Sequence, residues 1–282
     1  MVLETVMNKI IAINEQVTQL QTKASLLNAT VIENEDSLLI IDTLLLPKDS
    51  KELLRFCKTK NKPVKYIINT HYHSDHCYGN RFFDCYQPTI IAHEFYLVTI
   101  ESEKNIIAPH RPNLINKKLI RRPHITFSDS LHLPDFNLTI THAPGHSYDS
   151  TTIYSHEYDI YWTGDNVLNS DDHRIAIPYF YWGNPNQLYL ELLDLNKKRP
   201  KLIIPGHGNT CDYTKVKSDL IYLHNIMLAH SKLGNHPAEK SEILLKDCYP
   251  NSADSEFWVE KIHDFNLERL NFFSSQYEIT QL

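Results

Sequence analysis

The sequence predicts an α/β protein in which two β-sheets pack face to face and helices cover their outer faces. Short apolar segments with the period of a strand occur in both halves of the chain, and segments with helical spacing flank them. The strands do not alternate regularly with helices, as they would in a doubly wound sheet. No strand is expected after residue 205, so the chain ends in helices.

The elements follow from local signals. Residues 25–42 indicate two strands, because the apolar run Leu38–Ile41 follows a polar turn. Helical spacing of apolar side chains predicts a helix over Pro47–Lys60, and Pro63 ends it. By the same criteria we expect strands at 64–69, 89–92, 124–127, 130–133, 138–142, 151–155, 159–163 and 202–205, and helices at 93–101, at 187–195 and after 212.

The chain length suggests how these elements are divided. A chain of 282 residues is long enough for one large domain, or for a domain with a small appendage. Strands stop near Asp212, so we place the main domain at 1–211 and a C-terminal helical extension, packed on the same domain, at 212–282. Residues 103–123 contain three prolines and have weak periodicity. This irregular segment is the best candidate for a lid over a substrate site.

The charge of the chain argues against nucleic acid as a partner. The net charge is −6 with His neutral, whereas a nucleic-acid-binding protein usually carries a basic face. The basic run Lys117–Arg122 is either a solvated loop or a rim that attracts anionic substrates. We therefore expect a small-molecule substrate, and the sequence carries no signal for the oligomeric state.

Targeting signals and cysteines bear on the compartment. No apolar run approaches the roughly 18 residues of a membrane span, and the N-terminus lacks the pattern of a secretory signal. Five cysteines without a C-x-x-C pair favour free thiols in a reducing compartment. We expect a cytoplasmic protein that does not bind a membrane.

Three histidines and an aspartate gather in the segment Thr70–His76. On an extended backbone, side chains two residues apart point the same way, so His71 and His73 face one side together. Asp75 and His76 follow as the chain turns out of the strand. Imidazole nitrogens and carboxylate oxygens are common zinc ligands, so four of them within six residues predict a metal site. The alternative is a His-rich turn without a metal.

Glycine placement points to the remaining ligands. The chain has only seven glycines. Gly145 directly precedes His146, Gly164 precedes Asp165, and two more flank His207. Each of these positions follows a predicted strand, where a ligand needs a sharp turn and a close backbone approach that glycine permits. We therefore expect His146, Asp165 and His207 to join the site.

The order H-x-H-x-D-H, Gly-His-Ser, Gly-Asp and Pro-Gly-His-Gly resembles the metallo-β-lactamase superfamily, and all seven metal-site positions of that family are present. The resemblance implies a four-layer αββα sandwich with the helical extension at its C-terminus. It also implies a site for two Zn²⁺ ions, with Fe or Mn as alternatives. It assigns one metal to His71, His73 and His146, the second to Asp75, His76 and His207, and the bridging position to Asp165.

The resemblance gives two carboxylates further roles. Asp75 is expected to orient the nucleophile and to accept its proton. Asp42 matches a buried acidic position that supports the metal-binding loop in the family. From its place in the sequence alone, Asp42 is equally well explained as a cap at the end of a strand.

The resemblance further implies a hydrolase. Two metal ions about 3.5–4 Å apart can share a hydroxide that attacks a carbonyl-type substrate, such as a thioester, a lactone or a β-lactam. The alternatives are an iron-dependent redox relative, such as a persulfide dioxygenase, and a β-lactamase proper. His73 favours hydrolysis because di-iron relatives carry Glu there, and many true β-lactamases lack a bridging aspartate like Asp165.

The substrate pocket is expected in the segment between Asp165 and His207. An aromatic run there suits a partly wet pocket wall, with core packing as the alternative. Two polar residues suit its rim, with an ordinary polar loop as the alternative. The wall candidates are Tyr179, Tyr181 and Trp182, and the rim candidates are His173 and Asn184.

Overall fold

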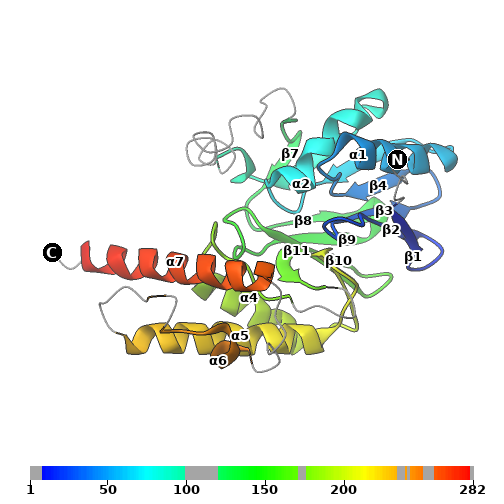
Figure 1. Ribbon diagram of the computed structural model, residues 1–282. Helices are drawn as coiled ribbons and strands as arrows, with labels where there is room; N and C mark the ends of the chain where they lie inside the picture. Colours follow the sequence, from blue (N-terminus) through cyan, green and yellow to red (C-terminus); the bar gives the residue numbers. More distant parts are fainter. Residues whose placement is uncertain are drawn as a thin grey trace, which may run out of the picture.

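The computed structural model describes residues 8–98, 120–170, 176–233, 239, 242–249 and 257–279. Two sheets pack face to face, with α1 and α2 on one side and α4, α5, α6 and α7 on the other (Figure 1). In the described residues one sheet has seven strands in the order β1-β2-β3-β4-β5-β6-β7, and the other has five in the order β12-β11-β10-β9-β8. This is the four-layer sandwich that the sequence predicts.

The seven-stranded sheet changes direction at β4. Neighbouring strands are antiparallel from β1 to β4 and parallel from β4 to β7. Helix α1 and the η1 turn lie in the connections between parallel strands, as such crossovers require. The elements are β1 (Lys9–Ala12), β2 (Val17–Gln21), β3 (Asn28–Glu33), β4 (Leu38–Ile41), α1 (Pro47–Thr59), β5 (Val64–Ile68), α2 (Ser74–Cys77), η1 (Tyr78–Tyr86), β6 (Thr89–His93) and β7 (Ile125–Phe127).

The second sheet is an antiparallel meander that ends in one parallel pair, β11 and β12. Helix α4 connects that pair, and the remaining helices follow β12. The elements are β8 (Ser130–Leu133), η2 (Pro134–Phe136), β9 (Leu138–His142), β10 (Thr151–Ser155), β11 (Ile160–Leu168), α4 (Pro185–Lys198), β12 (Leu202–His207), α5 (Tyr213–Lys232), α6 (Leu245–Cys248) and α7 (Phe257–Ile279).

Strand alternation builds a separate core on each face of the first sheet. In β4, Leu39 and Ile41 face the second sheet, whereas Leu38 and Ile40 belong to the cluster under α1. Residues two apart share a face, so one apolar run serves both cores. Between the sheets, the Trp162 indole N–H donates to the Thr30 hydroxyl at 3.0 Å, which satisfies the one polar atom of that ring.

A further core lies under the C-terminal helices. Tyr161 of β11, Leu192 of α4, Leu223 of α5 and Leu267 of α7 belong to one apolar cluster. Because the last helices share this cluster with the second sheet, we propose that residues 212–282 extend the same domain.

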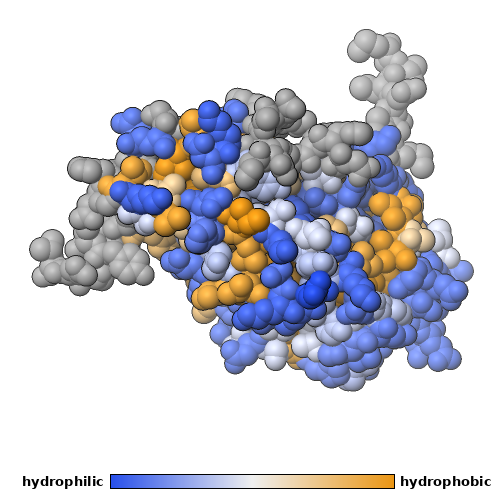
Figure 2. Space-filling view, turned by 90° about the horizontal axis from the view of Figure 1, so that it is seen from below, coloured by the Kyte–Doolittle hydropathy of each residue, from blue (hydrophilic) through white to orange (hydrophobic). Residues whose placement is uncertain are grey.

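The surface on the side covered by α4, α5, α6 and α7 has both polar and apolar groups. Figure 2 views this side from below and shows apolar patches separated by polar surface. On α4 and α5, Leu190, Ile221 and Leu228 are exposed by 62%, 51% and 44%. In the described part of the chain, no helix has both the length and the apolar character needed to cross a membrane.

Two features of the strands differ from the sequence expectation. Strand β2 lies before residue 25, where the sequence indicated no strand. Its Gln19 and Gln21 side chains are fully buried and donate to the Asn28 side chain. Because amide side chains occupy buried positions of β2, its sequence lacks the alternation of apolar and polar residues that predicts a strand. Strand β11 was expected to end at residue 163 but continues to Leu168, because the ladder is interrupted on both sides of Gly164 and then resumes.

Candidate metal centre

Four segments of the chain bring together the seven predicted ligands. The segment that leaves β5 and enters α2 supplies four, and the others come from the β9–β10 connection, from β11 and from the end of β12. The ligands form two groups, within each of which the ligand atoms lie within 4.8 Å of one another. The groups are His71, His73, His146 and Asp165, and Asp75, His76 and His207.

The first group centres on His73. Its Nδ1 atom lies 2.9 Å from His71 Nε2 and 2.9 Å from His146 Nε2. Asp165 Oδ2 lies 3.6 Å from His146 Nε2 and 3.9 Å from His71 Nε2. Three ring nitrogens and one carboxylate oxygen therefore face one another.

The second group lies on the other side of Asp165. Asp75 Oδ2 lies 3.3 Å from His207 Nε2 and 3.9 Å from His76 Nε2. Asp165 faces this group too, with Oδ1 3.3 Å from His76 Nε2 and Oδ2 3.7 Å from His207 Nε2. Asp165 thus lies between the two groups, where a shared carboxylate is expected.

Backbone carbonyls fix the orientation of two of the rings. His146 Nδ1 lies 2.6 Å from the Tyr179 carbonyl, and His207 Nδ1 lies 2.9 Å from the Ser25 carbonyl. A carbonyl oxygen only accepts, so Nδ1 donates in both rings, and the lone pair of the neutral ring is on Nε2. In both cases this lone pair faces the ligand groups.

Asp42 gives His71 and His76 the same tautomer, with a proton on Nδ1. The Asp42 carboxylate accepts from the Thr70 hydroxyl at 2.7 Å and from the Thr70 backbone N–H at 2.8 Å. Because this hydroxyl has donated its only proton, it accepts from His71 Nδ1 at 3.1 Å. Asp42 also accepts from His76 Nδ1 at 2.7 Å. In their neutral forms both rings therefore direct an Nε2 lone pair into the site.

The ligand groups fit a bound cation. His76 Nε2 and Asp165 Oδ1 are buried and 3.3 Å apart, and neither has a hydrogen-bond partner among the described residues. Two buried acceptors so placed are costly unless a proton or a metal ion lies between them. Imidazole and carboxylate are also the ligand types that zinc takes in the absence of thiolate. We propose that each group holds one metal ion and that the two share Asp165.

The histidine rings of the first group have lowered pKa values. Burial lowers the pKa of His71, His73 and His146, and neighbouring imidazoles lower the pKa of His71 and His73 further. The pKa of His73 falls to about 3. These rings are neutral at pH 7, as metal-binding imidazoles must be.

In the second group, by contrast, the histidine rings have raised pKa values and carry an additional proton. Burial opposes the charge on His76 and His207, but the carboxylates around them outweigh it. Asp165, Asp42 and Asp75 raise the pKa of His76 well above its usual value, and Asp165 and Asp75 raise the pKa of His207 to about 9. A metal ion at this group must displace those protons.

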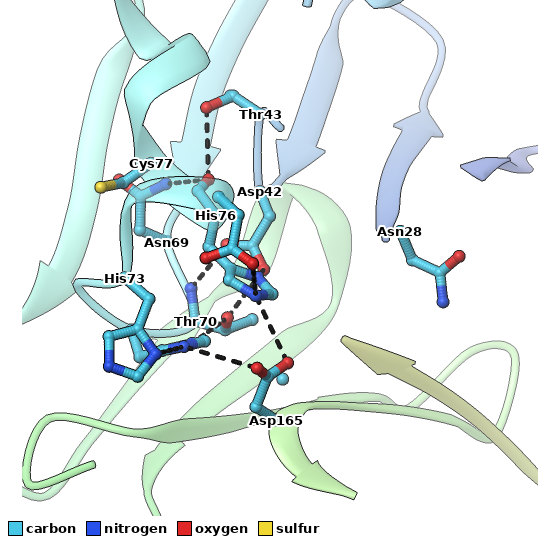
Figure 3. A network of polar contacts seen from close by, with 12 residues as sticks. Asn28, Asp42, Thr43, Asn69, Thr70, His73, His76, Cys77 and Asp165 are labelled. Atoms are coloured by element: carbon cyan, nitrogen blue, oxygen red, sulfur yellow. Dashed lines mark hydrogen bonds and ion pairs between the residues drawn. The ribbon is translucent and has the colours of Figure 1, made fainter. Parts of the chain in front are cut away.

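Buried amides hold the ligand loop from behind. The Asn69 and Asn80 side chains exchange hydrogen bonds at 2.7 and 3.2 Å. Thr43 donates its hydroxyl to Asn80 at 2.7 Å and its backbone N–H to the His76 carbonyl at 2.8 Å. Figure 3 shows the Thr43 and Asn69 side chains, which also donate to the His76 carbonyl. Sequence analysis missed these residues, although a polar residue directly after a buried strand is a usable signal.

Two glycines let the ligands approach the backbone. Gly164 has a φ of +51°, which favours glycine, and a Cβ atom there would lie 2.9 Å from the Thr70 side chain. A Cβ atom on Gly206 would lie 1.9 Å from Asp165 Oδ1. Any larger residue at Gly206 would displace the shared carboxylate.

The C-terminal helix α7 supports the first group through Asn266. This buried side chain donates to the Pro178 carbonyl at 2.7 Å and accepts from the Phe180 N–H at 3.1 Å. Pro178 and Phe180 flank Tyr179, whose carbonyl orients His146. Asn266 therefore fixes the backbone on both sides of that carbonyl. Sequence analysis missed it because its partners are 88 and 86 residues away in the chain.

A cavity of about 450 Å³ opens beside the ligands. Tyr179 and Trp182 line it, and the Trp182 ring stands edge-on to His73 with 6.4 Å between centroids. Tyr181 is not among the described lining residues, and its ring packs against Phe265 with a centroid separation of 5.3 Å. The aromatic run is therefore divided between the cavity and helix packing.

The rim candidates have a different outcome. The structure places Asn184 at the N-cap of α4, where its side chain accepts from two backbone N–H groups, and outside the cavity lining. Asn at the N-cap followed by Pro185 is a local capping signal that explains its position. His173 lies outside the described residues, as does most of the candidate lid at 103–123.

The two-sheet sandwich and its paired His and Asp groups define an α/β protein with a candidate metal site between strand ends. A sequence model of the metallo-beta-lactamase superfamily matches residues 24–207, which is more than half of the chain. The chain therefore belongs to the metallo-β-lactamase superfamily, and the expected family and hydrolase class are confirmed.

Two curated relatives are similar over long segments. Hydroxyacylglutathione hydrolase of Pelagibacter ubique (strain HTCC1062) is 25% identical over 202 residues, which are 69% of this chain and 73% of the relative. Acyl-coenzyme A thioesterase MBLAC2 of Gallus gallus is 26% identical over 160 residues, or 50% of this chain and 56% of that protein. The match thus spans little more than half the length of the second relative.

Solved structures show the same fold at low identity. DIM-1 metallo-beta-lactamase superposes with a TM-score of 0.65 and 15% identity, covering 78% of this chain and 98% of that one. The metallo-beta-lactamase from Pontibacter korlensis gives a TM-score of 0.62 and 19% identity, covering 77% and 99%. These similarities bear on the fold alone.

Metal loading of the second group is expected to release protons. His76 and His207 are protonated at pH 7 in the metal-free protein, because their pKa values are raised. Binding there should therefore release about two protons, and affinity should rise as the pH increases toward 9. Zinc titration by calorimetry, in buffers of different ionisation enthalpy, measures this release. Two binding events without proton release, or with an affinity that is constant from pH 6 to 9, would contradict the assignment.

Asp42→Asn is expected to weaken metal binding by about 10–100-fold, the usual effect of losing an outer partner of a ligand. Asp42 has a φ of +57°, which asparagine tolerates, so the backbone is preserved while the charged acceptor of His76 is lost. Competition with a chromogenic chelator measures the affinity. Asp49→Asn, at a buried carboxylate on α1, is the matched control. Equal zinc affinities in the two variants would remove Asp42 from the metal centre.

Asn266→Leu is expected to lower stability and, in addition, to lower zinc affinity about tenfold. The unpaired Pro178 carbonyl and Phe180 N–H each cost about 1–3 kcal/mol, and the Tyr179 carbonyl behind His146 loses its support. Asn225→Leu is the control, because Asn225 on α5 also donates to a backbone carbonyl, that of Cys248. Thermal unfolding and zinc competition are measured together. If the two variants lose stability without a difference in zinc affinity, Asn266 has a structural role only.

Proposed function

We propose that this protein is a zinc-dependent thioester hydrolase. The observation that carries the proposal is the position of Asp165 between two complete ligand groups, because a bridging aspartate distinguishes the thioesterase type of site from that of many true β-lactamases. Both curated relatives are named as enzymes that cleave thioesters, which supports the same reading. The solved lactamases share the fold at under 20% identity and do not favour a β-lactam substrate.

The metal ions, when bound, lower the pKa of water toward 7 and polarise a carbonyl oxygen. The chain supplies the proton acceptor. The Asp75 side chain is 31% exposed and lines the cavity. Burial alone would raise the pKa of Asp75, but His76 and His207 hold it below its usual value, so Asp75 is ionised at pH 7. Its exposure to the cavity and its ionised state support the proposed role of Asp75 in orienting a water molecule and taking its proton.

Rigid support of the ligands keeps this geometry in place. Tyr179 and Ser25 orient His146 and His207 through their carbonyls, and Asp42 orients His76. The cavity lies on the open side of the ligand groups, with the edge-on Trp182 ring as part of its wall. A substrate carbonyl enters from that side and meets groups whose positions are already fixed, which lowers the cost of orientation.

The test is a hydrolysis panel on the zinc-loaded protein. It contains an acyl thioester of a small thiol, S-lactoylglutathione, a lactone, a chromogenic β-lactam and a phosphodiester, each with and without a chelator. We expect chelator-sensitive turnover of a thioester, restored by zinc. Turnover of only the β-lactam or the lactone would overturn the thioesterase proposal, and oxygen consumption with a persulfide by iron-loaded protein would establish the redox alternative.

Two variants link the turnover to the ligands. His146→Ala and Asp165→Ala each remove a ligand that no neighbour replaces, so we expect turnover at background and less bound zinc. His142→Ala is the control, because this ring lies outside the ligand groups and stacks on His93 with 3.7 Å between centroids. Full activity of His146→Ala would refute the ligand assignment.

A further inference from the structure

We propose that the cavity beside the ligands holds an apolar acyl chain, so that the natural substrate is a thioester of an alkyl-type carboxylic acid. The inference rests on the proposed thioesterase function and narrows its substrate class. It is carried by the apolar wall of the cavity, which is built from three separate parts of the chain.

The cavity lining divides by chemistry into two parts. Its volume of about 450 Å³ is in the usual range of small-molecule sites. The polar part consists of ligand residues with a few hydroxyl and amide side chains. The apolar part includes Leu26, Leu168, Ile177, Trp182, Val259 and Ile262.

Leu26 is held in a conformation that a leucine does not favour. Its φ is +52°, in the left-handed region where a Cβ atom is crowded. The turn is fixed on both sides, because the Leu26 carbonyl accepts from the Gly208 N–H at 2.8 Å and the Ser25 carbonyl accepts from His207 at 2.9 Å. Glycine would satisfy this backbone without crowding. The leucine side chain therefore contributes something other than turn formation, and it lies against the cavity.

Helix α7 supplies another part of the apolar wall. Val259 and Ile262 are three residues apart and so lie on one face of the helix, and both line the cavity. The helix lies outside residues 24–207, which the family model matches. This part of the wall therefore lies outside the segment that the family model describes.

The charges of the lining indicate which part of a thioester enters. Among the described lining residues there is no Lys or Arg. Glutathione and coenzyme A carry carboxylates or phosphates, which proteins bind with such cations. We therefore place the acyl chain in the cavity and the thiol carrier toward solvent.

Straight-chain carboxylates test the cavity without turnover, because they are the acid products of the proposed reaction. The zinc-loaded protein is titrated by calorimetry with acids from acetate to octanoate. Affinity should rise about fourfold for each buried methylene, so that hexanoate, with four more methylenes, binds roughly 250-fold more tightly than acetate. An affinity independent of chain length overturns the inference. So does a rise seen with alkanethiols but not with carboxylates, since the cavity would then hold the leaving group.

Matched variants assign the effect to the proposed wall. Leu26→Gly removes the side chain and keeps the backbone, and Gln87→Gly is its control at an exposed residue with a φ of +50°. Ile262→Asn is paired with Ile221→Asn, at an exposed position of α5. The two wall variants should reduce the hexanoate-to-acetate affinity ratio at least fivefold, and the two controls should not. Unchanged ratios in both wall variants overturn the proposal.

The two proposals fail in distinguishable ways. An affinity that rises with chain length, in a protein that hydrolyses no thioester, retains the acyl site and removes the thioesterase function. Thioester turnover together with a flat affinity series retains the function and removes the acyl site.

Discussion

The centre of this structure is a set of buried acceptors that face one another. Four imidazoles spend their Nδ1 protons on oxygens behind the rings, and their Nε2 atoms meet the oxygens of Asp165 and Asp75 at separations of 3.3 to 3.9 Å. In the first group, whose rings are neutral, this arrangement is unfavourable without a cation, because desolvated lone pairs face one another. In the second group the protons on His76 and His207 relieve it in the metal-free protein. The arrangement becomes favourable when a cation is shared. The surrounding fold must therefore hold the rings in place against the tendency to relax.

The support comes from elements far apart in the sequence. His207 is held by the carbonyl of Ser25, 182 residues away, and His146 by that of Tyr179, 33 residues away. Asp42, at the end of β4, holds His76 and, through Thr70, His71. These partners are main-chain carbonyls and a fully buried carboxylate, which the fold already holds in place. Little conformational entropy is therefore lost when they orient the rings. The two sheets, packed on a common core, bring them to one place.

These distances explain what sequence analysis predicted and what it missed. The candidate ligands, which the structure brings together, could be singled out because residue type, strand ends and adjacent glycines are local signals. The fold class followed from strand periodicity and from the order of strands and helices. Which ring nitrogen faces the site depends on a partner elsewhere in the chain. Asp42 was equally well explained as a strand-end cap, and only its contacts with Thr70 and His76 separate the two roles.

Buried polar groups account for other differences. Strand β2 was missed because Gln19 and Gln21 occupy core positions, where their side-chain N–H groups donate to Asn28. Asn28 in turn donates to the carbonyls of Pro205 and Gly208, on either side of His207 along the chain. A pattern of apolar residues cannot reveal a strand whose buried face is polar, because the reason for that polarity is a contact with another sheet.

Helix α7 connects support of the metal centre with the shape of the cavity. Asn266 holds the backbone around Tyr179, and Ile262, four residues earlier and so one turn away, lines the cavity. The family model ends at residue 207, yet the orientation of His146 depends on a side chain 59 residues beyond that limit. Asp212 marks the change from strands to helices along the chain. The site before it still depends on the helix after it, so the two segments act together. In this chain, therefore, the candidate ligands before residue 208 and the helix α7 that follows them are linked, because α7 fixes the backbone behind His146 and lines the cavity.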